Sequence, residues 1–216
     1  MNKKILLLLI AFSGIMTGFA QKKNIYESSS FDELSKDHKT VAILPFKSRL
    51  ELDNSDHLSK EEIHEMEIIE AYEVQNALEH YFLKRDNRRS YRVNFQNVKN
   101  TNAILAKAGI TPENLDIHTV HELCKILNVD ALITGDISLN TLISQGVTDS
   151  FSFVDFFTGK SDYGRIAIKL SDGATGKLLW KYEKEINKKS GKNTNAIIES
   201  MMRQSTRKFP YSRNND

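Results

Sequence analysis

The chain contains a single cysteine among its 216 residues, so no internal disulfide can form. A cysteine without a partner in an exported protein is either buried and inert or pairs between chains. Cys124 lies beside the apolar positions of the amphipathic stretch 120–127, and a free cysteine packs like a small hydrophobic side chain. We therefore expect Cys124 to be buried, and the stability of the fold to come from its hydrophobic core.

The chain also lacks an apolar run long enough to span a bilayer. The stretch that begins at Ile5 ends by Ala20, which is shorter than the roughly 20 residues of a spanning helix. It follows a short basic start and ends in the small-x-small sequence Gly18-Phe19-Ala20, the layout of a secretory signal peptide. We predict a signal peptide at residues 1–20, cleavage after Ala20, and location in the periplasm or against the outer membrane. No cysteine follows the cleavage site closely, so no lipid can be attached there.

An excess of charge of one sign is missing as well. The precursor has 30 Lys and Arg against 28 Asp and Glu. Because Lys3 and Lys4 lie in the signal peptide, the remaining chain is balanced. A balanced chain has no general attraction to nucleic acid, which requires a concentrated basic face. Nor has it one to anionic lipid. We therefore expect no nucleic-acid partner and at most an indirect association with the membrane.

Strand and helix patterns alternate along the middle of the chain. Residues 39–46 form a buried apolar run of strand type that ends at Pro45. Ser59 and Glu62 match a capping box at the start of a long amphipathic helix. A glycine inside a strand, here Gly135, indicates a bulge or a close backbone approach. The other expected elements are the helix to about Lys84, a strand at 91–95, helices at 102–108 and 111–128, a strand at 131–137 and a helix from Thr194.

The last third of the chain predicts an antiparallel hairpin. Residues 165–170 alternate apolar and polar positions, residues 178–183 do so less strictly, and the turn-forming sequence 171–177 lies between them. Strands separated by helices favour parallel pairing. The expected fold is therefore a single α/β domain, with a mixed sheet of parallel strands flanked by helices and a late hairpin. Its expected limits are a tether at 21–38, the domain at 39–208 with a loop at 47–59 and an insertion at 138–162, and a tail at 209–216.

Motifs that would indicate catalysis or a metal site are absent or incomplete. No G-x-S-x-G sequence occurs. The glycines of 173–177 are too close together for a phosphate-binding loop, and a strand follows them instead of a helix. His118 and His121 are three residues apart on an expected helix, but a zinc site needs further ligands, and H-E-x-x-H does not occur. We expect no cofactor, no metal and no enzymatic activity, with a metal-dependent enzyme using these histidines as an alternative.

The insertion at 138–162 is the one segment whose composition points to a contact. It is longer than most connections within a domain and concentrates aromatic side chains. These candidate partner contacts are Phe151, Phe153, Phe156 and Phe157. Clustered aromatics in a loop often dock on another protein. The alternatives are that they fold over the core or form a further hairpin, including a membrane hairpin.

Three segments resemble the TolB amino-terminal-domain-like envelope proteins. They are the strand Val41-Ala42-Ile43-Leu44-Pro45-Phe46, the helix and strand of residues 123–135, and the hairpin sequence of residues 172–180. This group includes the curli-secretion channel lipoprotein and the lipoprotein activator of penicillin-binding proteins. The resemblance implies a non-enzymatic protein that binds other envelope proteins, in the assembly of a secretion or cell-wall complex. The alternative is a subunit of an outer-membrane oligomer or pore, in which copies of this chain would form a homo-oligomer.

Overall fold

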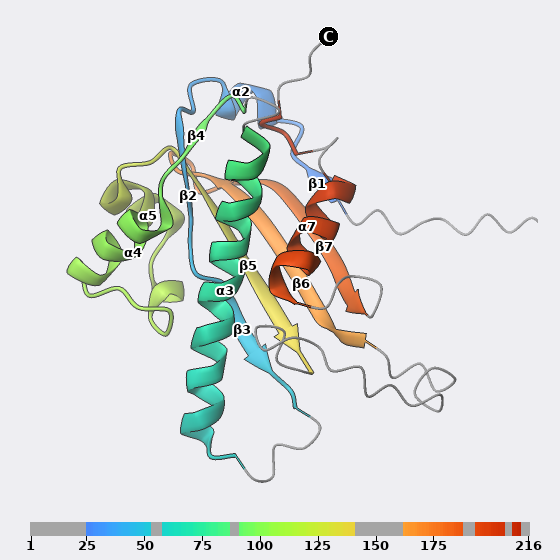
Figure 1. The fold of residues 1–216 in the computed structure, drawn as a ribbon. Coiled ribbons are helices and arrows are strands. Elements are labelled where there is room, and N and C mark those ends of the chain that lie inside the picture. The colour runs from blue at the N-terminus through green and yellow to red at the C-terminus, as the bar shows by residue number, and fades with distance from the viewer. Residues whose placement is uncertain are drawn as a thin grey trace, which may run out of the picture.

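A seven-stranded mixed sheet with helices on both faces forms the described part of the chain (Figure 1). The computed structural model describes residues 25–52, 58–86, 91–140, 162–187, 193–205 and 209–212. The strands are β1 (Ile25–Glu27), β2 (Thr40–Ile43), β3 (Lys47–Leu50), β4 (Asn94–Phe95), β5 (Ala131–Leu139), β6 (Asp162–Asp172) and β7 (Leu178–Asn187). The helices are α2 (Phe31–Ser35), α3 (Lys60–Asp86), α4 (Val98–Lys107), the short 3-10 turn η2 (Leu115–Ile117), α5 (Val120–Leu127) and α7 (Thr194–Ser205).

The strand order is β1-β7-β6-β5-β2-β4, and β3 also pairs with β5. β2 runs parallel to β4 and β5, and β3 runs parallel to β5. β5, β6 and β7 form an antiparallel meander, and β1 pairs antiparallel with β7. The expected fold class, a mixed sheet with parallel strands, flanking helices and a late hairpin, is confirmed.

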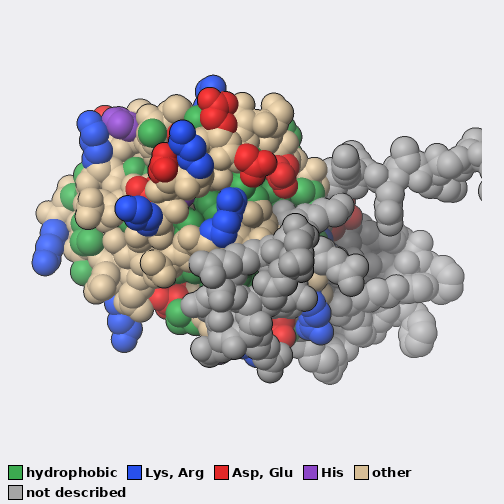
Figure 2. Space-filling view, turned by 90° about the horizontal axis from the view of Figure 1, so that it is seen from above, with side chains coloured by type: hydrophobic (Ala, Val, Ile, Leu, Met, Phe, Trp, Pro, Cys, Tyr) green, Lys and Arg blue, Asp and Glu red, His purple; other side chains and the backbone are tan. Residues whose placement is uncertain are grey.

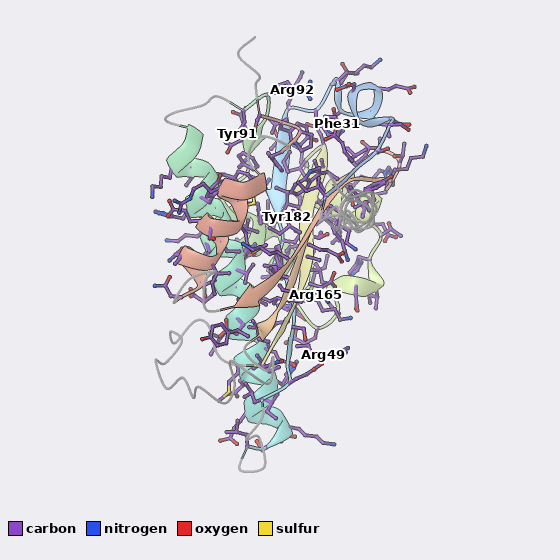
Figure 3. The ribbon with its side chains drawn as sticks, turned by 90° about the vertical axis from the view of Figure 1, so that its right-hand side faces the viewer. Phe31, Arg49, Tyr91, Arg92, Arg165 and Tyr182 are labelled. Atoms are coloured by element: carbon purple, nitrogen blue, oxygen red, sulfur yellow. The ribbon has the colours of Figure 1, made fainter. Side chains whose placement is uncertain are left out.

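Two cores of unequal size lie on the two faces of the sheet. α3 and α7 cover one face, on the same side of the strands in Figure 3, and enclose the larger core. α4 and α5 cover part of the other face around β2 and β5. In β2, Val41 and Ile43 belong to the larger core and Ala42 to the smaller. Burial on both faces explains why this strand reads as a continuous apolar run.

The chain beside β5 is interrupted at Pro45. β2 pairs as far as Ile43 with Ile133, and β3 resumes with Lys47 opposite Asp136. Three residues therefore face two, as in a bulge. A Cβ atom on Gly135 would lie 2.2 Å from Phe46 Cε1 and 2.1 Å from the carbonyl oxygen of Ala167. The close approach expected at Gly135 is therefore confirmed: only a glycine leaves room for Phe46 there.

The two ends of the described chain are more structured than the sequence indicated. Residues 25–38, expected as part of a tether, supply β1 and α2, and Phe31 is buried. Phe209 and Tyr211, expected in a tail, are buried as well. Arg92 lies over the rings of Phe31 and Tyr211, at 5.7 and 6.0 Å from their centroids. Figure 3 shows Arg92 and Phe31 at the same end of the molecule. Long-range aromatic contacts, which leave no local pattern in the sequence, therefore decide the placement of these residues.

Three element boundaries also differ from expectation. The predicted loop at 47–59 contains β3, whose outward residues are charged and so gave no apolar signal. The helix expected at 102–108 begins earlier, at Val98, where Asn97 accepts hydrogen bonds from two backbone N–H groups. The single helix expected at 111–128 is divided, because a capping box of Thr119 and Glu122 starts α5 afresh. The chain between α4 and α5 is therefore a separate segment that contains only the short turn η2.

Other local predictions are confirmed. Ser59 and Glu62 exchange the two hydrogen bonds of a capping box. Asn128 ends α5 in the left-handed conformation, at φ 53°. The hairpin turn between β6 and β7 forms as expected. Within the described ranges, no helix has the length and apolar character needed to cross a bilayer.

Candidate functional site

Two hollows lie on either side of residues 110–118, the segment between α4 and α5 that we call the ridge. The first has a volume of about 240 Å³ and opens between α3 and α4. The second, of about 190 Å³, opens over the bulge and β5. Pro45, Pro112 and Leu115 line both, so the bulge and the ridge form their shared wall. The first hollow is lined by Pro45, Ile68, Tyr72, Asn102, Leu105, Ala106, Ile110, Thr111, Pro112, Glu113 and Leu115.

A pair of side-chain amides fixes the walls of the first hollow. Gln75 of α3 donates through Nε2 to Asn102 Oδ1, and Asn102 donates back through Nδ2 to Gln75 Oε1, each at 3.0 Å. Gln75 also donates to the carbonyl of Ile43, at 2.7 Å. One turn further along α3, Glu79 accepts from the backbone N–H of Val98. These bonds hold α3, α4 and the end of β2 together, so the hollow is a built feature of the fold.

The ridge is anchored to the same elements. Within it, Asn114 accepts from the backbone N–H of Thr111 and donates to the carbonyl of Gly109. Asp116 accepts from Lys47 Nζ at 2.6 Å. Ile117, the residue after Asp116, is 75% exposed. On α3, Ile69 is 54% exposed next to Ile68 of the hollow lining.

The polar groups at the rim keep a defined charge. A hydrogen bond from the Thr111 hydroxyl, together with the nearby charge of His64, holds the pKa of Glu113 below its usual range. Its partner His64 Nε2 lies 3.5 Å away. Burial, reinforced by the negative charge of Glu113, raises the pKa of Tyr72. At neutral pH, Glu113 is therefore a carboxylate and Tyr72 a neutral hydroxyl that can donate a hydrogen bond.

The size of the hollows limits what they can take. Pockets for drug-sized ligands usually measure about 300–1,000 Å³, and both hollows are smaller. Their lining is mostly apolar. Small apolar sockets of this kind suit a single side chain inserted by another protein, the usual anchor of a protein interface. This arrangement suits binding, and among the described residues no metal-binding cluster lies at either opening.

Comparisons with known proteins give similarity of shape only. No protein-family model matches the chain, and no curated protein matches its sequence. Lipoprotein GNA1162 from Neisseria meningitidis is 12% identical, with a TM-score of 0.43 over 78% of this chain and 99% of its own. The LpoB C-terminal domain from Salmonella enterica is 10% identical, with a TM-score of 0.36 over 70% of this chain and 84% of its own. The PelC dodecamer from Paraburkholderia phytofirmans is 10% identical, with a TM-score of 0.32 over 76% and 89%.

Similarity this low identifies no function for the chain. LpoB, the penicillin-binding-protein activator lipoprotein, belongs to the group that the sequence resembles. The links to TolB and to the curli channel stay predictions.

A second polar cluster lies deep inside the molecule. His38 contacts the Tyr211 hydroxyl through Nδ1 at 2.5 Å and Asp172 Oδ1 through Nε2 at 2.9 Å. Asp172 also accepts from the backbone N–H of Thr175 at 2.7 Å. The His38 and Asp172 side chains are only 6% and 2% exposed. The cluster joins the chain before β2, the hairpin turn and the C-terminal segment, so we assign it a structural role.

The structure separates the two histidines of the metal hypothesis. His118 precedes α5 and lines the second hollow. His121, within α5, donates from Nδ1 to the carbonyl of Gly173 at 2.9 Å. Placing both on one helix was therefore wrong. Across the described residues, no group of three or more His, Cys, Asp or Glu side chains is arranged to hold a metal ion. The four phenylalanines at 151–157 lie outside the described residues.

Cys124 is buried, as expected. Burial, together with the negative charges of Asp172 and Asp130, raises the pKa of its thiol to about 12. The thiolate is the reactive form. We therefore expect a water-soluble disulfide reagent to modify Cys124 at least ~10-fold more slowly in the native protein than in urea. Stopped-flow absorbance measures both rates, and an equally fast native reaction would contradict the buried, inert assignment.

Sequence reasoning missed the residues that build the hollows. Gln75 and Asn102 are polar residues on separate helices, and no local pattern pairs them. Ile117 did carry a signal of exposure. It is a single apolar residue between the polar Asp116 and His118, and it does not fall on the apolar stripe that a buried helix face requires. Reading 111–128 as one continuous helix concealed that signal.

Proposed function

We propose that this protein is an exported, non-catalytic module that binds other envelope proteins through the two hollows and the ridge between them. The observation that carries the proposal is the exposed Ile117 on a ridge with a small apolar socket on each side. Exposed apolar surface beside a preformed socket is costly for an isolated protein and is typical of an interface. The signal-peptide pattern of residues 1–20 supports export to the periplasm.

The chemistry of the described residues favours binding over catalysis. The His38–Asp172 pair is enclosed, and the pKa of Cys124 is too high for a nucleophile at neutral pH. Basic and acidic side chains are interspersed over the end of the molecule seen in Figure 2, as on a surface without a single-sign binding field. The phenylalanines Phe151, Phe153, Phe156 and Phe157 remain a proposed second contact.

A photo-reactive amino acid at position 117 tests the proposal in living cells. We expect discrete crosslinked bands, identified by mass spectrometry as envelope proteins. The matched control places the same amino acid at Glu33, an exposed position on α2 away from the ridge. The substitution Ile117→Asp should lower the affinity for the identified partner about 10-fold or more, as loss of an interface anchor does. Recovery of monomer alone from position 117 would overturn the proposal.

A further inference from the structure

We propose that the first hollow takes a bulky apolar side chain of a partner segment whose lysines or arginines lie toward the start of α3. The inference rests on the proposed function and adds the chemistry of the partner. It depends on two neighbouring features of the fold. One is the apolar socket, and the other is a row of carboxylates at one end of that socket.

The socket provides the anchor point. Ile68 and Tyr72 of α3 form one wall, and Leu105 and Ala106 of α4 form the other. The reciprocal amide bonds of Gln75 and Asn102 keep the two walls apart at a fixed spacing. A socket that exists before binding costs little to order, so one inserted side chain supplies a large share of the affinity.

The carboxylates would set the orientation of the bound partner segment. Glu61 and Glu65 precede Ile68 and Tyr72 at spacings of three and four, which places them on the same stripe of α3. Glu113 of the ridge lines the hollow itself. Within the described part of the chain, no ion pair engages Glu61 or Glu65. Three carboxylates therefore gather where α3 begins and the ridge crosses it.

The positive side chains around the hollow do not cancel this row. α4 runs antiparallel to α3, because Glu79 contacts Val98 while Gln75 contacts Asn102. Lys99 consequently lies near the end of the hollow that is opposite the carboxylates. His64 already contacts Glu113, and Lys107 follows Ala106. At the start of α3, residues 60–67 carry four glutamates against Lys60 and His64, so carboxylates stay in excess there. A net negative rim at one end favours a cationic partner segment, by attraction that salt weakens.

Selection of randomised peptides displayed on phage tests this chemistry directly. The bait is the exported protein, purified from the envelope fraction. We expect enriched peptides to carry one bulky apolar residue with Lys or Arg on one side. Synthetic copies should bind ~10-fold or more weakly to Ala106→Phe, which fills the socket from its rim. Ala103→Phe, at an exposed position of the same helix, is the matched control and should bind normally.

The contribution of the carboxylates to binding is tested with Glu65→Gln combined with Glu113→Gln. This variant should bind the peptides about two- to fivefold more weakly and should lose part of the salt dependence. Glu33→Gln is the control. Thermal unfolding of each variant confirms that the fold is retained.

Several results would overturn the inference. They are enrichment of acidic or uncharged peptides, binding unchanged in Ala106→Phe, binding unchanged in the double glutamine variant, and a concentration-dependent dimer that Ala106→Phe abolishes. If crosslinks at position 117 still identify envelope proteins, the proposed function stands while the partner chemistry fails. If those crosslinks are absent as well, both fail.

Discussion

Replacing Phe82 with alanine is expected to lower the free energy of unfolding by about 3–5 kcal/mol, as truncation of a buried phenylalanine does. The Phe82 ring is fully buried and stacks on Phe95 with their centroids 4.2 Å apart. It also meets Tyr91 at 5.6 Å and Phe209 at 5.1 Å. One side chain of α3 thus holds the strand segment 91–95 and the C-terminal segment, so its loss leaves a cavity between three parts of the chain.

Urea unfolding followed by circular dichroism measures this change. Leu83→Ala, at the next position of α3, is the matched control, because Leu83 is 54% exposed. An exposed substitution of this kind should change the free energy of unfolding by no more than about 0.5 kcal/mol. Equal effects at the two positions would contradict the packing of α3 onto the aromatic cluster.

The long, strongly patterned elements were the parts of the fold that could be predicted from sequence. The Ser59–Glu62 capping box starts α3, and the alternation around residues 165–170 marks the β6–β7 hairpin. These signals are local: a cap, a helical stripe or an alternating strand is set by residues close in sequence. The bulge was half visible, since Pro45 and Gly135 each indicated an interruption of a strand.

The remainder depends on contacts between residues far apart in the chain. β3 is only four residues long, and its exposed side chains, Lys47 and Arg49, are charged. Only its pairing with β5 therefore defines it as a strand. The C-terminal Phe209 and Tyr211 carry no periodic pattern and are placed by the rings that they meet. The hollows exist because α4, α3 and the ridge converge on the bulge. No local periodicity encodes that convergence, so the hollows could not be located from sequence.

Replacing Asp172 with alanine should also lower the free energy of unfolding, by roughly 1–3 kcal/mol, as leaving a buried donor without its acceptor does. Asp172 is 1% exposed and accepts hydrogen bonds from His38 and Thr175. Its loss leaves His38, whose side chain is 6% exposed, without its acceptor, and removes the link between the segment before β2 and the hairpin turn. Asp136→Ala is the control, because Asp136 pairs with Lys169 in an exposed position. Exposed pairs contribute about 0–1 kcal/mol.

The same carboxylate should leave a signature in the pH dependence of stability. Burial opposes its ionisation, but hydrogen bonds from Thr175 and His38 outweigh burial and hold the pKa of Asp172 below its usual range. A carboxyl group whose pKa is lower in the folded than in the unfolded state stabilises the fold above its unfolded pKa of about 3.9 and loses that contribution as the pH falls further. The free energy of unfolding of the wild type should therefore drop more steeply below about pH 4 than that of Asp172→Asn. Parallel curves from urea titrations across this range would contradict an ionised Asp172 in the buried cluster.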